Sequence, residues 1–212
     1  MTNDKRFIAI AGNIGVGKSS LTARLSDHFG WSPFYEAVDD NPYLADFYDD
    51  MQRWSFHSQI YFLSRRLRHH KDLLTHPNHV IQDRSVYEDA EIFARNLFEQ
   101  GQMQQRDYDS YRELYEIMVE LLPPPNLLIY LRADINTLIT RIEKRGRDFE
   151  RNIESAYLQD LNRLYEAWIA NFTRCPVLII QANRYDFVEN KIDFRYIVDQ
   201  ITDQLQQGQE GS

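Results

Sequence analysis

Apolar residues gather in five short runs, separated by longer stretches in which apolar and polar residues recur at helical spacing. The runs cover residues 7–11, 34–35, 80–82, 127–131 and 177–181. All except the second lack polar alternation, a pattern typical of parallel strands that are covered on both faces. Strands that alternate with helices predict a doubly wound α/β fold with a five-stranded parallel sheet flanked by helices.

Local signals give the ends of two helices in the middle of the chain. Ser85 and Glu88 have the spacing of a capping box, so a helix should begin just after Arg84, and Gly101 should end it. The next helix, over 105–121, should stop before a run of three prolines because proline disfavours helix at the preceding residue.

Two further regions show helical signals. Residues 42–74 are rich in aromatic side chains and favour helices. Asp134 is expected to cap a helix that reaches Lys144, because a carboxylate accepts hydrogen bonds from the first free backbone N–H groups.

The composition limits the class of protein. With 212 residues, 43% of them hydrophobic, the chain can build one domain with a full core. We expect residues 1–206 to form it and residues 207–212 to be a frayed tail. The net charge of −8 disfavours nucleic acid as a partner, because such binding needs Lys and Arg to displace counterions.

The cysteine content and the termini bear on location. One cysteine, Cys175, allows no internal disulfide and predicts a reducing, cytoplasmic environment. The polar residues 1–6 do not fit a signal peptide, and no apolar run approaches the ~20 residues that span a bilayer. We therefore expect no membrane partner.

Residues 12–19, Gly-Asn-Ile-Gly-Val-Gly-Lys-Ser, lie between the first apolar run and a helix-like stretch. This is the strand, loop and helix order of a P-loop, and it is preferred over a simple tight turn. Glycines let successive N–H groups face phosphate oxygens, lysine reaches the β- and γ-phosphates, and serine ligates Mg²⁺. The residues expected to bind ATP here are Gly12, Asn13, Ile14, Gly15, Val16, Gly17, Lys18, Ser19 and Ser20.

Charged residues close two of the strands. Asp83 and Arg84 follow the third apolar run, where ligands bind in such sheets, so Asp83 could hold Mg²⁺ or accept a proton and Arg84 could pair with phosphate. A surface salt bridge is the alternative. Glu36 follows the second run and could bond an acceptor hydroxyl, or be a solvated acid.

Residues 141–151 carry five basic and three acidic side chains around a helix-breaking Gly146. This pattern predicts an Arg-rich lid that closes over the donor phosphates and excludes water, with a solvated charged face as the alternative.

Two other motifs imitate a GTPase. Residues 190–193 spell Asn-Lys-x-Asp and residues 27–30 spell Asp-x-x-Gly, but neither falls at the strand end where a GTPase needs it. We therefore set aside a signalling GTPase.

Taken in order, these motifs resemble the deoxyribonucleoside kinase family over about residues 6–200, and most of all its bacterial deoxyadenosine/deoxyguanosine branch. That family implies a P-loop kinase fold, phosphoryl transfer from ATP with Mg²⁺ to the 5′-hydroxyl of a deoxynucleoside, and a homodimer. The matching residues are 12–19, Tyr35-Glu36, Trp54-Ser55-Phe56 with Gln59, Asp83-Arg84-Ser85 with Asp89, Arg145-Gly146-Arg147 with Glu150, and Asp186-Phe187.

The resemblance assigns roles near the reacting hydroxyl. Glu36 matches the carboxylate usually named the general base, whereas Asp83 matches a residue tied to Mg²⁺ that some descriptions make the base. Both are therefore candidate catalytic residues, and Ser19 and Asp83 are the metal ligands. Arg84 matches an arginine near the 5′-oxygen.

The resemblance also assigns the binding residues. It places Tyr48 and Glu150 on the 3′-hydroxyl and Gln59 on the base edge. Arg66 (or its neighbour Arg65) pairs with Asp89 at the base end of the pocket. The remaining matches are Tyr157 in the same pocket, Arg141, Arg145 and Arg147 on the donor phosphates, and Asp186 and Phe187 at the donor base.

The branch of the family favours a purine deoxynucleoside, deoxyadenosine before deoxyguanosine. Ser58 stands where pyrimidine-using relatives often carry an aromatic residue. A nucleoside monophosphate kinase of the thymidylate kinase type shares the P-loop, the Asp-Arg pair and the lid, and is the nearest alternative. A nucleotide-sensing module without catalysis is the alternative from another class.

Overall fold

The computed structural model describes residues 5–35, 41–147 and 153–210. The chain divides into two compact units. Unit 1 comprises Met1–Tyr35, Pro77–Arg84 and Pro124–Ser212, and unit 2 comprises Glu36–His76 and Ser85–Pro123. Within the described ranges, no helix combines the length and the apolar character that crossing a membrane requires.

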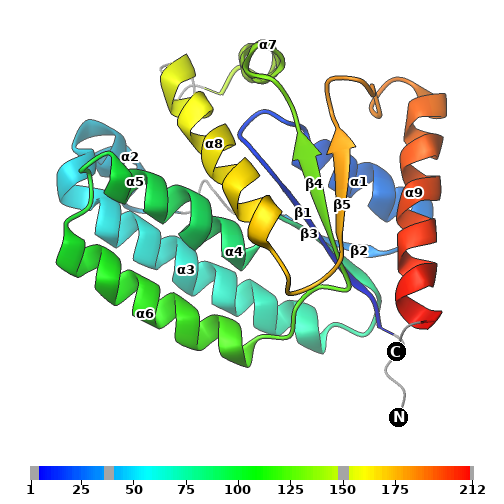
Figure 1. Cartoon of the computed structure of the whole chain (residues 1–212), viewed down its shortest axis with the longest axis horizontal. Coiled ribbons are helices and arrows are strands. Elements are labelled where there is room, and N and C mark those ends of the chain that lie inside the picture. The colour runs from blue at the N-terminus through cyan, green and yellow to red at the C-terminus, as the bar shows by residue number, and fades with distance from the viewer. Residues whose placement is uncertain (1–4, 36–40, 148–152, 211–212) are drawn as a thin grey trace. The chain divides into compact units, whose positions relative to one another are not determined.

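Unit 1 is built on a five-stranded parallel sheet with strand order β2-β3-β1-β4-β5 (Figure 1). The central strand β1 is buried at every position because its side chains are apolar and both faces are covered. The strands are β1 (Phe7–Gly12), β2 (Ser32–Phe34), β3 (Val80–Asp83), β4 (Leu127–Arg132) and β5 (Val177–Gln181).

All five predicted strands are present and their parallel pairing is confirmed, although β2 covers Ser32–Phe34 instead of the predicted residues 34–35. The expectation of full cover on both faces is wrong for the last strand, β5. It lies at the edge of the sheet, so its side chains are mostly half-buried and Ile179 is exposed.

Helices cover both faces of this sheet. In Figure 1, α1 and α9 lie on one face and α8 on the other. Leu21 and Leu25 of α1 and Ile197 and Ile201 of α9 pack with the strands in one buried apolar cluster. The helices of unit 1 are α1 (Lys18–Phe29), α7 (Ile135–Arg145), α8 (Ser155–Asn171) and α9 (Lys191–Glu210).

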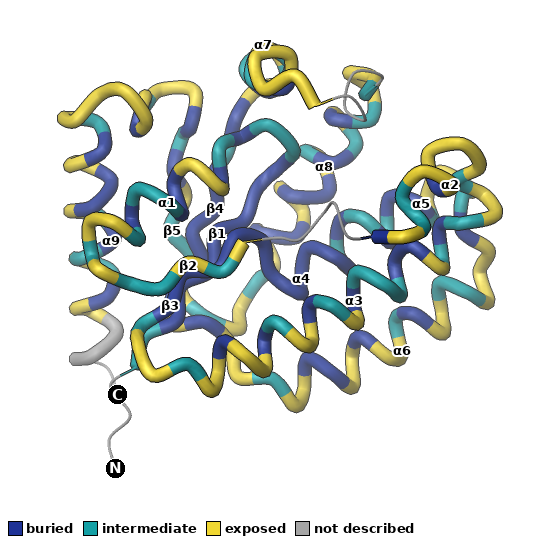
Figure 2. Tube along the Cα trace, turned by 180° about the vertical axis from the view of Figure 1, so that it is seen from behind, coloured by how far each residue is buried: buried dark blue, intermediate teal, exposed yellow. Residues whose placement is uncertain are grey.

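Unit 2 is entirely helical in its described part. The long helix α3 packs against η1 and α6, and its buried positions alternate with exposed ones along the helix (Figure 2). The elements are α2 (Leu44–Asp49), α3 (Met51–Thr75), α4 (Val86–Glu88), η1 (Asp89–Ala94), α5 (Arg95–Glu99) and α6 (Gln105–Leu121).

The predicted helix ends agree well with the structure. The capping box of Ser85 and Glu88 is formed, and α6 covers the predicted residues 105–121. The side chain of Asp134 accepts a hydrogen bond from the Thr137 N–H, 2.8 Å, at the start of α7. What the pattern did not predict is η1, a π-helical segment that widens the helix after Ser85.

The end of the chain differs from the prediction. Helix α9 continues to Glu210, beyond residue 206 where we expected fraying to begin. Ile201 and Leu205 anchor this part of the helix in the core of unit 1.

Candidate active site

The P-loop connects β1 to α1 as predicted. Gly12, Gly15 and Gly17 all have positive φ angles, which the loop requires and which other residues rarely adopt. A Cβ atom on Gly12 would lie 2.7 Å from the Leu131 carbonyl oxygen, so no larger residue fits there. The buried Lys18 donates from Nζ to the carbonyl oxygens of Gly12, 2.8 Å, and Asn13, 3.1 Å, which folds its ammonium group over the loop.

Asp83 meets this loop from the end of β3. The Ser19 hydroxyl donates to Asp83 Oδ2 at 2.5 Å, so the two predicted metal ligands lie side by side. Asp83 is buried, and its Oδ1 has no hydrogen-bond partner among the described residues. A buried carboxylate oxygen without a partner, next to a serine hydroxyl, fits a hard cation that prefers oxygen ligands.

Arg84 follows in an unusual backbone conformation. Its φ of 67° makes it the one described non-glycine residue with a positive φ. Its backbone N–H bonds to the Ile10 carbonyl at 2.9 Å, and its guanidinium Nη1 donates to the Tyr165 hydroxyl at 3.4 Å. Strained backbone of this kind persists where the surrounding structure holds it, and it is frequent at functional sites.

Helix α8 holds the P-loop through residues that the sequence reasoning missed. The Tyr165 hydroxyl donates to the Gly12 carbonyl at 2.9 Å. Asn13 Nδ2 donates to the Leu158 carbonyl, 3.0 Å, and to Asn162 Oδ1, 2.7 Å. The signal was present: Leu158, Asn162 and Tyr165 recur at helical spacing, and two of them are polar on an otherwise apolar face.

Arg141, expected on the donor phosphates, has backbone partners in this structure. It donates to the Val16 carbonyl and to the Ala182 carbonyl, each at 2.7 Å. Burial lowers its pKa, with Asp186 acting in the opposite direction. Arg145 and Arg147 are exposed near the end of α7. Much of the predicted lid, including Glu150, lies outside the described residues, so the lid stays a prediction.

The predicted donor-base loop lies after β5. The Phe187 ring is buried, and its Cζ would lie 3.0 Å from a Cβ atom on Gly17. Asp186 accepts hydrogen bonds from the N–H groups of Glu189, 3.0 Å, and Val188, 3.2 Å, and these lower its pKa. The structure therefore places Phe187 directly beside the P-loop.

The two GTPase-like motifs have other roles. Asn190 accepts hydrogen bonds from the N–H groups of Ile192 and Asp193 at the start of α9. Asp193 in turn accepts one from the Asp186 N–H at 2.8 Å. Asp27 lies within α1, so both motifs are helix sequence and helix caps.

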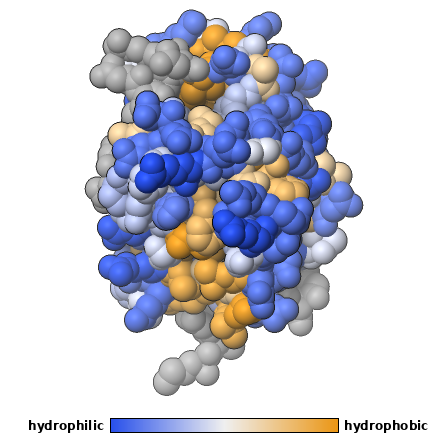
Figure 3. Space-filling view, turned by 90° about the vertical axis from the view of Figure 1, so that its left-hand side faces the viewer, coloured by the Kyte–Doolittle hydropathy of each residue, from blue (hydrophilic) through white to orange (hydrophobic). Residues whose placement is uncertain are grey.

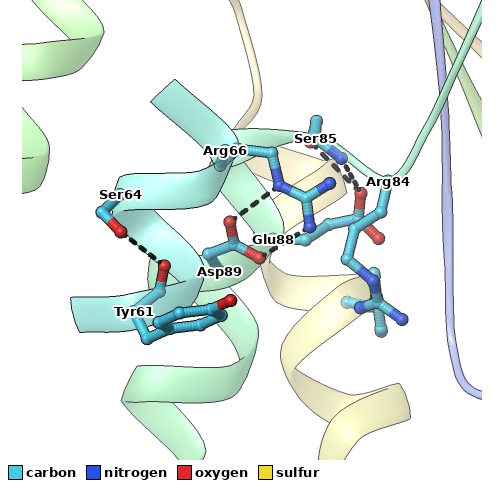
Figure 4. Close-up of polar contacts among 8 residues, drawn as sticks. Tyr61, Ser64, Arg66, Arg84, Ser85, Glu88 and Asp89 are labelled. Carbon is cyan, nitrogen blue, oxygen red and sulfur yellow. Dashed lines mark hydrogen bonds and ion pairs between the residues drawn. The ribbon is translucent and has the colours of Figure 1, made fainter. Parts of the chain in front are cut away.

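In unit 2, Arg66 and Asp89 form a buried two-pronged ion pair. Arg66 Nε donates to Asp89 Oδ2 at 3.0 Å and Nη2 to Oδ1 at 3.3 Å, with each side chain about 4% exposed. Figure 4 shows Arg66 reaching from α3 toward Asp89. The neighbouring Arg65 instead bonds the Tyr61 hydroxyl, so Arg66 is the partner of Asp89.

Other residues of unit 2 that we expect to bind the nucleoside lie on α3 or close to it. Gln59 lies two turns before Arg66, on the same side of the helix, and is buried. The preceding Ser58 is also buried and accepts a hydrogen bond from Asn41 Nδ2 at 3.0 Å. Tyr48, on α2, is largely exposed.

Two predicted residues remain, and the structure describes one of them. Tyr157 is half-buried on α8 of unit 1. Glu36 lies outside the described residues, so its assignment to the 5′-hydroxyl stays a prediction.

The sheet order, the P-loop and the Ser19–Asp83 pair define a P-loop phosphotransferase. The model of the deoxynucleoside kinase family matches residues 8–206. The chain belongs to this family.

Similar proteins of known name support this assignment to the family. A deoxyadenosine/deoxycytidine kinase of Bacillus subtilis is 42% identical over 96% of this chain and 94% of its own. A deoxyguanosine kinase of Lactobacillus acidophilus is 40% identical over 94% of this chain and 91% of its own. A solved deoxyadenosine kinase of M. mycoides with dCMP and dCDP bound has a TM-score of 0.82 at 32% identity, covering 93% of this chain and 99% of that one. The P-loop kinase fold is thereby confirmed.

Proposed function

We propose that this deoxynucleoside kinase transfers the γ-phosphoryl group of ATP to the 5′-hydroxyl of a purine deoxynucleoside, deoxyadenosine first and deoxyguanosine second, in deoxynucleotide salvage. The observation that carries the proposal is the buried Arg66–Asp89 pair on the same side of α3 as Gln59. Similar proteins named deoxyadenosine and deoxyguanosine kinases support the choice of purine.

The pairing of Arg66 with Asp89 favours a nucleoside over a nucleoside monophosphate as acceptor. A second phosphate would need a free cation, whereas the carboxylate of Asp89 already neutralises this guanidinium at 3.0 Å. The buried Gln59 offers a donor and an acceptor on one amide, which suits the edge of a base. This arrangement argues against the thymidylate kinase alternative.

The donor is bound by unit 1. The loop residues 12–20 present backbone N–H groups to the phosphates, and Lys18 moves its ammonium from the loop carbonyls to the β- and γ-phosphates. Arg145 and Arg147 close over the phosphates, while Asp186 and Phe187 form the wall at the donor base.

Ser19 and Asp83 would hold Mg²⁺, together with phosphate oxygens of the donor. Bound there, the ion would neutralise charge on the phosphates during transfer. The described residues contain no cluster of three or more His, Cys, Asp and Glu side chains placed for a metal. A magnesium site completed by the donor itself accords with this, because Mg²⁺ is usually bound by one or two protein carboxylates plus substrate phosphates.

Two carboxylates are candidates for the base that receives the proton of the 5′-hydroxyl. We assign Glu36 to this role because Asp83 is committed to Ser19 and to the metal. Arg84 stabilises the transferring group, and Tyr48 and Glu150 bind the 3′-hydroxyl. We also assign Tyr157 to nucleoside binding.

The second proposed partner is another copy of this chain. Figure 3 shows hydrophobic residues interspersed with hydrophilic ones on the side of the molecule that it views. Five large apolar residues are exposed at one- and two-turn spacing on the packed helices α3 and α6, and isologous pairing of two such faces forms a dimer. They are Leu67, Leu74, Leu114, Ile117 and Leu121.

The dimer has a matched test. Leu121, on α6, is 78% exposed, and Ile192, on α9, is 79% exposed. Leu121→Lys combined with Ile117→Lys should give a monomer in light scattering after gel filtration, and Ile192→Lys should not. A monomeric parent protein would refute the dimer. The single cysteine and the nucleoside substrate support a cytoplasmic location.

The function is tested by the rate of ADP release with MgATP and one acceptor at a time: the four deoxynucleosides and deoxyadenosine monophosphate. We expect the highest kcat/KM with deoxyadenosine, followed by deoxyguanosine. Turnover confined to the monophosphate would refute the proposal in favour of a monophosphate kinase. Absence of ADP with every acceptor would indicate a nucleotide-sensing module.

A further inference from the structure

The hydroxyl of Tyr165 joins two functional segments of unit 1. It donates to the carbonyl oxygen of Gly12, the first residue of the P-loop, at 2.9 Å, and it accepts from Arg84 Nη1 at 3.4 Å. A phenol carries one proton, and that proton is directed at Gly12. The oxygen of the hydroxyl is therefore available to accept the hydrogen bond from Arg84, whose guanidinium can only donate.

The position of this hydroxyl is fixed by packing. Tyr165 is fully buried, its ring is stacked with Tyr130 at 5.7 Å between centroids, and Trp168 lies edge-on at 6.2 Å. A phenylalanine would keep the same ring contacts. The hydroxyl thus adds polar contacts whose two partners both belong to the phosphoryl-transfer machinery.

Arg84 is a residue that needs such support. Its backbone occupies the left-handed region, φ 67°, and it is held by a hydrogen bond from its N–H to the Ile10 carbonyl. Its side chain is flexible along four bonds, so a positioned guanidinium requires partners that restrict it. Tyr165 restricts one end of the guanidinium relative to the start of the P-loop.

We propose that Tyr165 is a positioning residue for phosphoryl transfer, which holds the Arg84 guanidinium in register with the P-loop through the shared hydroxyl. The inference rests on the proposed function, because it takes Arg84 as the group that stabilises the transferred phosphoryl. It predicts an effect on the transition state rather than on the binding of either substrate.

The test is Tyr165→Phe, which removes the hydroxyl and keeps the ring. One hydrogen bond contributes about 0.5–1.5 kcal/mol, so kcat should fall about 2- to 10-fold while KM for MgATP and for deoxyadenosine stays within about 2-fold. Tyr130→Phe is the matched control: its hydroxyl bonds Glu166 at 3.0 Å. It should keep kcat within about 2-fold of the parent, although it also loses the hydrogen bond of a tyrosine hydroxyl.

A double-mutant cycle separates positioning from a structural role. In an Arg84→Gln background, Tyr165→Phe should change kcat by less than about 2-fold, because the group that it positions is gone. An equal fall in both backgrounds, a rise in the KM for MgATP alone, or an unchanged kcat would each overturn the proposal.

The parent protein is measured in the same series. Absence of turnover in the parent would refute the proposed function. A normal parent with an unaffected Tyr165→Phe variant refutes the role of Tyr165 alone.

Discussion

The P-loop of unit 1 and the Arg66–Asp89 pair of unit 2 are constructed differently, and our proposal assigns a binding role to each. The P-loop is made of backbone, and glycine φ angles and contacts such as that between Gly12 and Leu131 determine its shape. The pair in unit 2 is made of two side chains from different helices, buried together. The shape of the P-loop requires glycines, which have no Cβ atom, whereas the pair in unit 2 requires two side chains of opposite charge.

The difference teaches which changes each region should tolerate. The glycine positions of the P-loop should not tolerate a larger side chain. The phosphates that such a loop binds are common to all nucleotides, so the loop does not distinguish bases. We expect that apolar residues could replace the pair in unit 2 without loss of the fold, and that this change would remove the base recognition that we propose for the pair. We therefore expect substitutions in the P-loop to reduce catalysis and substitutions in the Arg66–Asp89 pair to reduce base specificity.

The largest effect should come from Glu36→Gln, which removes the proposed base and leaves both binding regions intact. We expect kcat to fall by about 10²- to 10⁴-fold with donor affinity retained. The measurement is steady-state turnover with MgATP and deoxyadenosine, beside ATP binding by calorimetry. Turnover within a few-fold of the parent would remove Glu36 as the base, and a comparable fall in Asp83→Asn with unchanged Mg²⁺ dependence would move that role to Asp83.

The next largest effect should come from a substitution in the P-loop. Lys18→Ala should lower kcat by about 10²- to 10³-fold, because the side chain stabilises charge on the transferring group. The loss should be equal for deoxyadenosine and deoxyguanosine, since we assign the acceptor base to residues of unit 2 and the donor phosphates to the P-loop. Lys191→Ala, at the start of α9, is the control and should leave turnover unchanged. A loss that differed between the two bases would contradict the separation of the regions.

The ion pair can be tested for stability and specificity together. Arg66→Met should lower the free energy of unfolding by about 3–5 kcal/mol, since it leaves the Asp89 carboxylate buried without its partner. Arg66→Met with Asp89→Leu should recover most of that stability and yet lose discrimination among bases. Urea unfolding and kcat/KM for the four deoxynucleosides measure the two properties.

A partly exposed ion pair supplies the control for this experiment. Arg112 donates to Glu91 at 2.8 Å, with side chains 25% and 24% exposed. Arg112→Met should cost about 1 kcal/mol or less and leave base selection unchanged. Equal costs for Arg66→Met and Arg112→Met would show that burial does not set the difference.

The smallest effect concerns pH and unit 2. Burial of His70 lowers its pKa to about 4, although a hydrogen bond to the Pro123 carbonyl acts in the other direction. The folded state keeps this imidazole neutral, whereas the unfolded chain binds a proton near pH 6.5, so stability should fall as pH falls from about 6.5 to about 4. His70→Gln should flatten the pH dependence of urea unfolding. The exposed His57→Gln should not, and an unchanged slope for His70→Gln would contradict the prediction.

Much of unit 1 was predictable because its chemistry is tied to backbone geometry. The P-loop letters, the strand that precedes Asp83 and the cap at Asp134 each require particular residue types at particular spacing. The partner of Asp89 was not settled by the sequence, since Arg65 and Arg66 are adjacent and helix phase decides which of them is buried. Tyr165 and Asn162 were missed because their helical spacing on an apolar face indicates a buried polar contact but does not identify the P-loop as its partner.

The central claim is that this chain phosphorylates purine deoxynucleosides rather than their monophosphates. The most direct test is one competition reaction containing MgATP, equal amounts of the four deoxynucleosides and deoxyadenosine monophosphate, with products followed by mass spectrometry. We expect deoxyadenosine to be converted first and deoxyguanosine second, each to its 5′-monophosphate. Conversion of a pyrimidine deoxynucleoside ahead of both purines, or of the monophosphate ahead of any deoxynucleoside, would contradict the account.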